Sequence, residues 1–365
     1  MSQPTLYLLS LRNLSPYPAQ GCILDLEDVF SEISGAKILA PASDLDIAEV
    51  LKDVPHQSAD LFITAISVGD VIRLLKGMNG RGKIFRKIYT YIFDAFLSPD
   101  LPKGRGLLKQ FSRTTRAVSQ IDHMFITLRP AVEEFGIHYG VPVSYVPMAA
   151  DVVKFGTAQS KRCIDVNAYG RQNVSHVHAL ADLYNTKDSG RSLHYTSHVS
   201  FTRVNDLYRH RAFFWKVLSM SRIALAYDPS RVNPDRRHFP FAYVAQRWFE
   251  SLAAGCVVAG YRPVCSDADQ LLHWEDATIE CPENPGEFVE FIESLLEDAD
   301  RLNRVRLNNC FHMALSHDWC YRIEDMFKFL GLELDPHALA RRREMLARMA
   351  REITPQLGIA AHETK

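Results

Sequence analysis

The feature that most constrains this chain is a repeated alternation of short apolar runs with amphipathic helical segments. In the first half, the apolar runs lie at residues 6–11, 36–39, 60–65, 88–93, 123–127 and 143–146. Helical segments at residues 25–33, 46–51 and 71–75 lie between the first four of these runs. Strands that alternate with helices form mostly parallel sheets with both faces covered. The pattern therefore predicts an α/β domain.

A second series of the same kind begins near residue 160. Its predicted strands are residues 163–169, 193–195, 223–227 and 256–260, and its predicted helices are residues 177–184, 205–218, 245–254 and 288–296. Gly255 directly follows one of these helices and is a typical helix stop. Parallel sheets bind their ligands at the carboxyl ends of the strands, so we expect functional residues in the loops that follow the strands.

The length of 365 residues is about twice that of a usual single domain. We predict an N-terminal domain over residues 1–150, a C-terminal domain over 151–330, and a basic helix and tail over 331–365. The apolar positions of this tail have helical spacing: Leu339, Leu346, Met349 and Ile353. Five arginines surround them: Arg341, Arg342, Arg343, Arg348 and Arg351. We favour a docked surface helix with a solvated basic side over a helix that lies on a membrane.

Composition excludes several classes of protein. Hydrophobic residues make up 47% of the chain and charged residues 23%, which excludes disorder along its length. The formal net charge of -1 excludes a general binder of polyanions. The seven cysteines contain no C-x-x-C pair, which argues against a disulfide framework or a zinc ribbon. Because no apolar run reaches about 18 residues, and the start lacks a basic leader, we expect a cytoplasmic location.

Three motif-like patterns fail on inspection. Gly77, Gly82 and Lys83 have the spacing of a phosphate-binding loop, but Ile84 replaces the hydroxyl residue that holds magnesium. The pairs His194/His198 and His176/His178 lack the acidic partner that a metal site needs, so solvated or core-edge histidines are the better interpretation. No G-x-G-x-x-G follows a strand, so no dinucleotide-binding fingerprint is present.

The most informative segment is residues 247–260, with the sequence RWFESLAAGCVVAG. It is predicted as a helix that carries a glutamate, a glycine stop and a buried strand. This order resembles the donor-binding domain of the GT-B glycosyltransferases, and is most similar to the group-1 branch of spore-maturation-type enzymes, with its Arg-x-Phe-Glu core. Three further segments resemble the family in the correct order: an interdomain segment at 146–155, a strand with a Gly-Arg turn at 164–171, and a closing helix at 316–322 that in the family returns toward the first domain. The resemblance covers about half of the chain.

The resemblance implies an α/β fold of two Rossmann-like domains that face a cleft. It implies a hexosyltransferase-type enzyme that moves a sugar from a nucleotide-diphospho-sugar, with UDP or GDP, to a saccharide, lipid-linked or protein acceptor. Retention of configuration, independence of metal and the absence of a cofactor also follow from it, in a setting of bacterial polysaccharide biosynthesis. The alternative is a non-catalytic GT-B-like module that binds a nucleotide-sugar or has a regulatory role.

The resemblance also assigns donor-site residues. Glu250 would accept hydrogen bonds from both ribose hydroxyls. Arg171 would neutralise the charge that grows on the departing diphosphate. The helix of Glu250 is expected to begin near Ala242 to Val244, with its amide groups toward the diphosphate. The remaining donor-binding candidates are Gly170, Tyr243, Val244, Arg247 and Ser251.

Two departures from the family pattern support the non-catalytic alternative. Ala242 stands where many relatives have a first glutamate, although the Arg-x-Phe-Glu branch tends to lack it. The lysine that usually follows the Gly-Arg turn is absent from residues 172–178. His176 and Arg247 are the candidates to replace it.

In the first domain, the resemblance places acceptor-side residues after two strands. Asp94 follows one of them and would orient an acceptor hydroxyl or act as a base, and the alternative is a loop acid that caps a turn. Arg12 and Asn13 follow the first strand.

Residues 73–116 carry eleven basic side chains against two acidic ones. Apolar residues lie between these basic side chains. The segment therefore predicts a contact with anionic lipid at the inner face of the plasma membrane, or with an anionic acceptor. We favour this over a nucleic-acid contact or a solvated face.

Overall fold

The computed structural model describes residues 4–14, 17–55, 58–78, 85–96, 117–197, 203–232 and 241–358. The chain divides into two compact units. Unit 1 comprises Met1–Met148, Arg203–Tyr208 and Trp319–Ala340, and unit 2 comprises Ala149–Thr202, Arg209–Asp318 and Arg341–Lys365. Each unit is thus made of three separate stretches of the chain, whereas each predicted domain (1–150, 151–330 and 331–365) is one continuous stretch.

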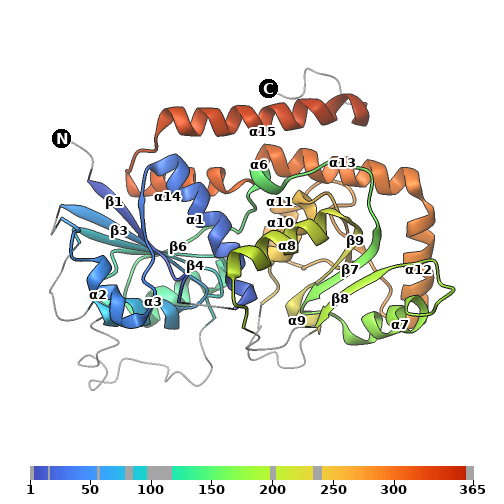
Figure 1. The fold of residues 1–365 in the computed structure, drawn as a ribbon, viewed down its shortest axis with the longest axis horizontal. Helices are drawn as coiled ribbons and strands as arrows, with labels where there is room; N and C mark the ends of the chain where they lie inside the picture. Colours follow the sequence, from blue (N-terminus) through green and yellow to red (C-terminus); the bar gives the residue numbers. More distant parts are fainter. Residues whose placement is uncertain are drawn as a thin grey trace. The chain divides into compact units, whose positions relative to one another are not determined.

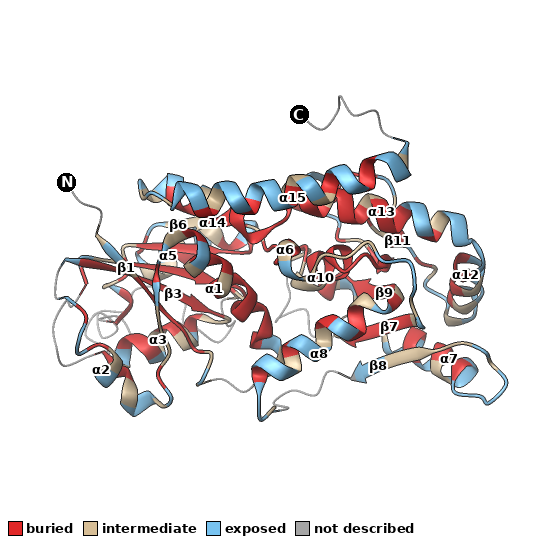
Figure 2. Cartoon of the chain, turned by 45° about the horizontal axis from the view of Figure 1, so that its top comes forward, coloured by how far each residue is buried: buried red, intermediate tan, exposed pale blue. Residues whose placement is uncertain are grey.

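Unit 1 is built on a six-stranded parallel sheet of order β2-β1-β3-β4-β5-β6 (Figure 1). Its strands are β1 (Thr5–Leu9), β2 (Lys37–Leu39), β3 (Ala59–Ala65), β4 (Lys87–Ile92), β5 (His123–Ile126) and β6 (Val143–Tyr145). Every residue of the central strand β3 is buried, which Figure 2 shows in red. A continuous apolar strand buried on both sides is typical of a parallel sheet.

Helices cover this sheet. They are α1 (Gly21–Ser34), α2 (Ile47–Val50), α3 (Val68–Gly77), α5 (Val132–Tyr139) and α14 (Trp319–Leu330), with short 3-10 turns at Pro18–Gln20, Asp44–Asp46 and Arg129–Ala131. Helix α14 comes from far along the sequence and packs on α1, where the rings of Phe30 and Phe327 lie 5.3 Å apart. Such an edge-to-face pair adds about 1 kcal/mol beyond the apolar area that it buries.

Unit 2 contains a five-stranded parallel sheet of order β11-β10-β9-β7-β8. Its strands are β7 (Ile164–Gly170), β8 (Leu193–Ser197), β9 (Ser221–Tyr227), β10 (Val257–Tyr261) and β11 (Ile279–Glu280). The helices that follow the chain through this half are α6 (Val152–Phe155), α7 (Val174–Tyr184), α8 (Leu207–Ser219), α9 (Pro229–Val232), α10 (Gln246–Ala253), α11 (Ser266–Leu271), α12 (Pro285–Glu297), α13 (Ala299–Ser316) and α15 (Pro336–Leu357). The first residues of α8 and α15 belong to unit 1.

The two faces of the second sheet are covered by different helices. Helices α7 and α12 form one core with the sheet, through buried Leu180, Phe288 and Ile292 among others. The side chain of Tyr169, on β7, contacts both α8 and α10, so these two helices share the other face. Helix α13 packs on α10.

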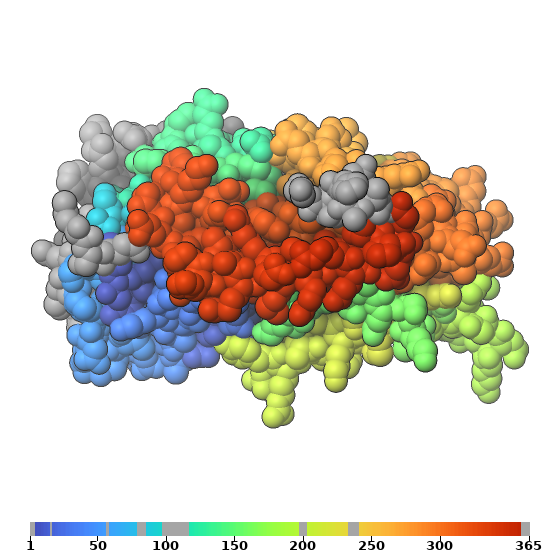
Figure 3. All heavy atoms as spheres, turned by 90° about the horizontal axis from the view of Figure 1, so that it is seen from above, coloured from blue at the N-terminus to red at the C-terminus, as the bar shows by residue number. Residues whose placement is uncertain are grey.

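The C-terminal helix α15 is a docked surface helix, as predicted. Leu346 and Ile353 are buried, and Figure 3 shows the outer side of the helix on the surface of the molecule. The interpretation of Arg342 as a solvated residue is wrong, because its side chain is only 3% exposed and pairs with Asp318 and Asp151. Arg342 lies on the apolar stripe of the helix. A buried charge at such a position is stable only if it pairs with an opposite charge.

The predicted strands and helices are confirmed to within a few residues, apart from two segments. The predicted helix at 46–51 is a 3-10 turn followed by the single turn of α2. The segment 316–322 belongs to two helices, α13 and α14, of which α13 was not predicted. Within the described residues, no helix is long and apolar enough to cross a membrane.

Candidate functional site

The candidate donor site lies at the edge of the second sheet where its strands end. Strand β7 ends at Gly170, whose φ of 69° is a conformation that glycine adopts without strain. A Cβ atom at this position would lie 3.0 Å from Nη2 of Arg247. The Nη1 group of Arg247 also donates a hydrogen bond to the carbonyl oxygen of Arg171. The guanidinium of Arg247 therefore packs directly against the Gly-Arg turn.

Helix α10 supplies Arg247 and begins at the same edge of the sheet. Its first residue is Gln246, and Ala245 precedes it with extended backbone; no described side chain caps this end. The first amide groups of a helix have no acceptor within the helix, and the helix dipole makes this end attractive to anions. The expected start near Ala242 to Val244 is wrong. Tyr243 and Val244 precede the helix and are buried in the segment that leads into it.

Glu250 lies on the second turn of α10 and is buried. Its Oε1 atom pairs with Nη2 of Arg211, on α8, at 2.6 Å, and the two side chains are 6% and 8% exposed. Ser251 is also buried, and its hydroxyl lies 3.0 Å from the hydroxyl of Tyr169. The hydroxyl of Tyr169 donates its proton to the carbonyl oxygen of Arg247, so in the contact with Ser251 it accepts. The end of β7 is thus tied to α10 at two neighbouring turns.

Burial controls the ionisation of the groups around this turn. It lowers the pKa of Arg247, and the nearby positive charge of Arg171 lowers it further. Burial likewise raises the pKa of Tyr169 far above its ordinary value, and the neighbouring Glu250 contributes in the same direction. The neighbouring groups therefore do not fully offset the hydration that the charged guanidinium of Arg247 loses on burial. An anion at the turn would favour the charged form.

His176, one candidate to replace the missing lysine, lies in the core of unit 2. Its Nδ1 atom is 3.1 Å from the hydroxyl of Tyr227, and its Nε2 atom is 3.0 Å from the carbonyl oxygen of Glu283. The ring stacks on Phe288 at 4.0 Å, and the side chain is fully buried. Both nitrogens are engaged in the core, so Arg247 is the better candidate for a diphosphate.

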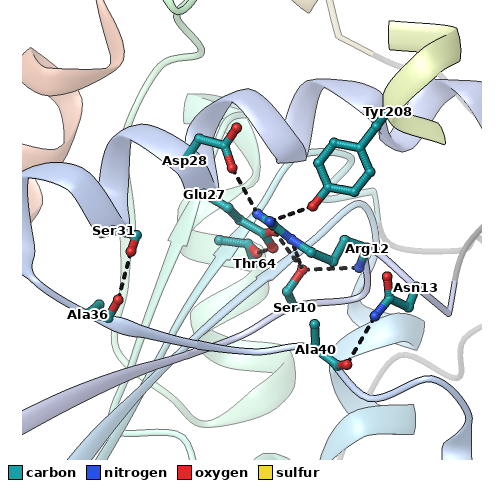
Figure 4. A network of polar contacts seen from close by, with 10 residues as sticks. All are labelled: Ser10, Arg12, Asn13, Glu27, Asp28, Ser31, Ala36, Ala40, Thr64 and Tyr208. Atoms are coloured by element: carbon teal, nitrogen blue, oxygen red, sulfur yellow. Dashed lines mark hydrogen bonds and ion pairs between the residues drawn. The ribbon is translucent and has the colours of Figure 1, made fainter.

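Unit 1 has a polar cluster at the corresponding edge of its own sheet (Figure 4). Arg12 follows β1, and its Nη2 atom lies 2.8 Å from Oε2 of Glu27, a fully buried carboxylate on α1. The hydroxyls of Ser10 and Thr64 also donate to Glu27. Arg12 further donates to the hydroxyl of Tyr208 at 2.5 Å. The guanidinium of Arg12 is therefore fixed from both of its ends.

Asp94 and Asn13 lie at the same edge of the first sheet. The backbone amide of Asp94, two residues after β4, donates to the carbonyl oxygen of Ile66 at 2.6 Å, and its side chain is half-buried. Asn13 is exposed and donates to the carbonyl oxygen of Ala40 at 3.1 Å. The strands that precede Asp94 and Arg12 are separated by one strand, β3. The three predicted acceptor-side residues thus share one edge of the sheet.

Three charged or polar groups of these clusters were not predicted. Glu27 and Arg211 occupy apolar stripes of their helices: Glu27 lies between Ile23 and Phe30, and Arg211 lies four residues from both Leu207 and Trp215. A charge on an apolar stripe is the signal that would have identified both. Tyr208 offers no such signal, because it is exposed and polar residues follow it in the sequence.

The basic segment 73–116 lies mostly outside the described residues. Four of its basic side chains are described, and three of these pair with acids: Arg73 with Asp44, Arg86 with Asp60 and Lys87 with Asp122. The proposed lipid or anionic contact of this segment stays a prediction. Within the described ranges, no group of three or more His, Cys, Asp or Glu side chains could hold a metal ion.

Comparison with known proteins finds a family match over part of the chain. Residues 161–328 match the model of a family described as glycosyl transferase-like. This stretch contains the Gly-Arg turn, Arg211 and all of α10. No sequence among the curated proteins matches the chain.

Solved structures match over most of the length. Anabaena HepE (Alr3699), in complex with UDP and glucose, matches 90% of this chain and 100% of its own, with 11% identity and a TM-score of 0.54. HepE in complex with UDP matches with 10% identity and a TM-score of 0.50, over 90% of this chain and 100% of its own. The predicted fold class, α/β with two Rossmann-like domains of the GT-B type, is confirmed. The chain thus shares the fold of HepE, and its second half is similar to a glycosyl transferase-like family.

Proposed function

We propose that the protein is a glycosyltransferase that uses a nucleotide-diphospho-sugar, bound at the carboxyl edge of the sheet of unit 2. One observation carries the proposal. Arg247 packs on the Gly170–Arg171 turn beside the start of α10, which no described side chain caps, within the residues that match the glycosyl transferase-like family. A diphosphate at this place would meet two arginines and the positive end of a helix.

The residues of this edge suggest a mechanism without a metal ion. The sugar C1–O bond breaks through an oxocarbenium-like state, and negative charge grows on the departing diphosphate. Arg171, Arg247 and the first amides of α10 stabilise that charge. Glu250 binds the ribose of the same nucleotide through its carboxylate. We further propose retention of the sugar configuration.

UDP is the first nucleotide to test, because the similar HepE structures contain it and one of them contains glucose as well. The acceptor is proposed to be a saccharide, a lipid-linked group or a protein. Asp94 in unit 1 would orient or deprotonate its hydroxyl. A lipid-linked acceptor agrees with a cytoplasmic enzyme whose segment 73–116 contacts anionic lipid at the inner face of the membrane.

Slow donor hydrolysis tests this proposal without knowledge of the acceptor. Purified protein is incubated in EDTA with UDP-glucose, UDP-N-acetylglucosamine or GDP-mannose, and release of the nucleoside diphosphate is followed. We expect release from one donor, and a rate about 100-fold lower in Arg171→Gln, since the loss of one group that stabilises developing charge has that magnitude. Lys187→Gln, an exposed cation that follows α7, is the matched control.

If the protein binds one of these donors but hydrolyses none of them, the result would instead favour the non-catalytic module. Equal rates in Arg171→Gln and Lys187→Gln would remove Arg171 from the mechanism.

A further inference from the structure

The ion pair between Arg211 and Glu250 joins two helices on one face of the second sheet. Nη2 of Arg211 lies 2.6 Å from Oε1 of Glu250, and both residues are buried. The pair lies next to Tyr169, whose hydroxyl binds α10 and whose ring packs edge-on to Phe214 of α8 at 5.0 Å. The contact therefore belongs to the framework that supports the candidate donor site.

Aromatic rings fix the guanidinium of Arg211 on its other side. It lies 4.7 Å from the ring centre of Phe214 and 5.0 Å from that of Trp215. Trp215 is itself stacked on Phe155 at 4.5 Å, with an angle of 6° between the rings. A cation over aromatic faces gains energy from each of them, and a guanidinium held in this way loses little entropy when it binds a carboxylate.

This arrangement is costly if it serves stability alone. Two charges that are removed from water lose hydration, and buried ion pairs can often be replaced by apolar side chains without loss of stability. A fixed guanidinium does have a use beside a ligand-binding carboxylate, because it holds the carboxylate in one orientation. A carboxylate has about four acceptor positions, more than one arginine occupies, so an arginine and a diol can bind the same carboxylate.

We propose that Arg211 is a positioning residue that orients Glu250 toward the ribose hydroxyls and so sets the preference of the site for ribonucleotides over 2′-deoxyribonucleotides. The inference rests on the proposed donor site. Arg211 itself touches no substrate in this account. Its effect passes through the carboxylate of Glu250, so its loss acts on the recognition of the sugar hydroxyls more than on the recognition of the diphosphate.

The test compares dissociation constants for UDP and 2′-deoxy-UDP, and for the corresponding guanosine and adenosine pairs, in the full-length protein. A hydrogen bond to a charged group contributes enough for a preference of about tenfold or more. We expect the wild-type protein to prefer the ribonucleotide by this factor. Arg211→Met should abolish most of the preference, and Arg211→Lys, which retains a charge without the fork of donors, should keep an intermediate preference.

The ratio of the two constants separates positioning from a general loss of structure. A destabilised fold weakens the binding of both nucleotides equally and leaves the ratio unchanged. Lys216→Met, an exposed cation on the same helix, should leave both the constants and the ratio unchanged. If Arg211→Met does not fold, the ratio in Arg211→Lys decides.

Each outcome has one meaning. A wild-type preference that both Arg211 variants retain in full, while Glu250→Gln abolishes it, overturns the inference and leaves the donor site intact. A preference that Glu250→Gln also retains overturns the role of Glu250 and with it that of Arg211. Absence of binding by any of the three ribonucleoside diphosphates overturns the proposed function itself.

Discussion

Arg342 and Asp318 form a buried, two-point ion pair. Nε of Arg342 lies 2.7 Å from Oδ1 of Asp318, and Nη2 lies 2.9 Å from Oδ2. The same arginine binds Asp151, and Oδ2 of Asp318 accepts a hydrogen bond from the amide of Val152 at 2.9 Å. A parallel bridge joins Ala150 to Asp318. Three distant segments of the chain are thus fixed at one place in unit 2.

Arg342→Met should destabilise the protein strongly, because it removes a cation that pairs with two buried carboxylates. The loss of one partner of a buried pair costs about 3–5 kcal/mol. Urea unfolding, followed by circular dichroism, measures the change. Arg341→Met removes the neighbouring, exposed charge and should change the free energy of unfolding by about 0.5 kcal/mol or less. Equal effects of the two substitutions would contradict the role of the buried pair.

Arg12→Met should destabilise the protein more at pH 7.5 than at pH 5. Burial raises the pKa of Glu27 above its ordinary value of 4.5, and Arg12 opposes the shift. Because the folded pKa is the higher one, the contribution of Glu27 to stability is full below the unfolded pKa and is lost as pH rises through the folded pKa. Without Arg12, the ionised carboxylate is left buried at neutral pH.

Unfolding of this variant at both pH values measures the effect, and Asn13→Ala, at the exposed neighbour, is its control. The double variant with Glu27→Gln should recover much of the stability at pH 7.5. A loss that is independent of pH would argue that Arg12 acts through packing alone.

His176 should make the protein less stable in mild acid. Burial lowers the pKa of its ring below the ordinary value of 6.5. The unfolded chain then binds the proton more readily, so the stability from neutral His176 is present above pH 6.5 and is lost as pH falls through the folded pKa. His176→Gln should reduce the slope of unfolding free energy against pH between 7 and 5. His178→Gln, on the exposed side of the same helix, should leave the slope as it is in the wild type.

Gly170→Ala should weaken nucleotide binding more than it weakens the fold. Gly170 and Gly190 have similar positive φ angles, 69° and 61°, but only at Gly170 would a Cβ atom meet another side chain, that of Arg247. Alanine in this conformation costs about 1 kcal/mol at either position. Thermal unfolding should therefore show similar losses, while the affinity for a nucleoside diphosphate should fall only in Gly170→Ala. A fall of the same size in Gly190→Ala would contradict the close contact at the turn.

The elements of the fold follow closely from the sequence. Strands β3 and β9 contain apolar runs, at residues 61–63 and 223–227, that the parallel sheets bury, and α12 has a regular apolar stripe. The pattern alone placed this helix at residues 245–254, close to the observed bounds of α10, whereas the start near Ala242 to Val244 that was expected for the donor site was wrong, because these residues lead into the helix with non-helical backbone. The return of the chain to unit 1 in α14 was expected only from the family resemblance, and no local pattern reveals the tertiary packing that fixes it, such as that of Phe30 on Phe327.

The candidate sites follow from the sequence only in part. The Gly-Arg turn and the glutamate of α10 stand in the order that a known family has, so their positions could be predicted. The partners of these residues could not. Arg211 and Glu27 are identified only when the fold brings a charge on one apolar stripe against an opposite charge or a hydroxyl from another element.

Isothermal titration of UDP, GDP and ADP into the wild-type protein and into Glu250→Gln tests the central claim most directly. The account predicts that one of the three nucleotides binds the wild-type protein with a stoichiometry of one, and that Glu250→Gln weakens this binding about tenfold or more while the protein remains folded. No binding of any nucleoside diphosphate, or the same affinity in both proteins, would contradict it.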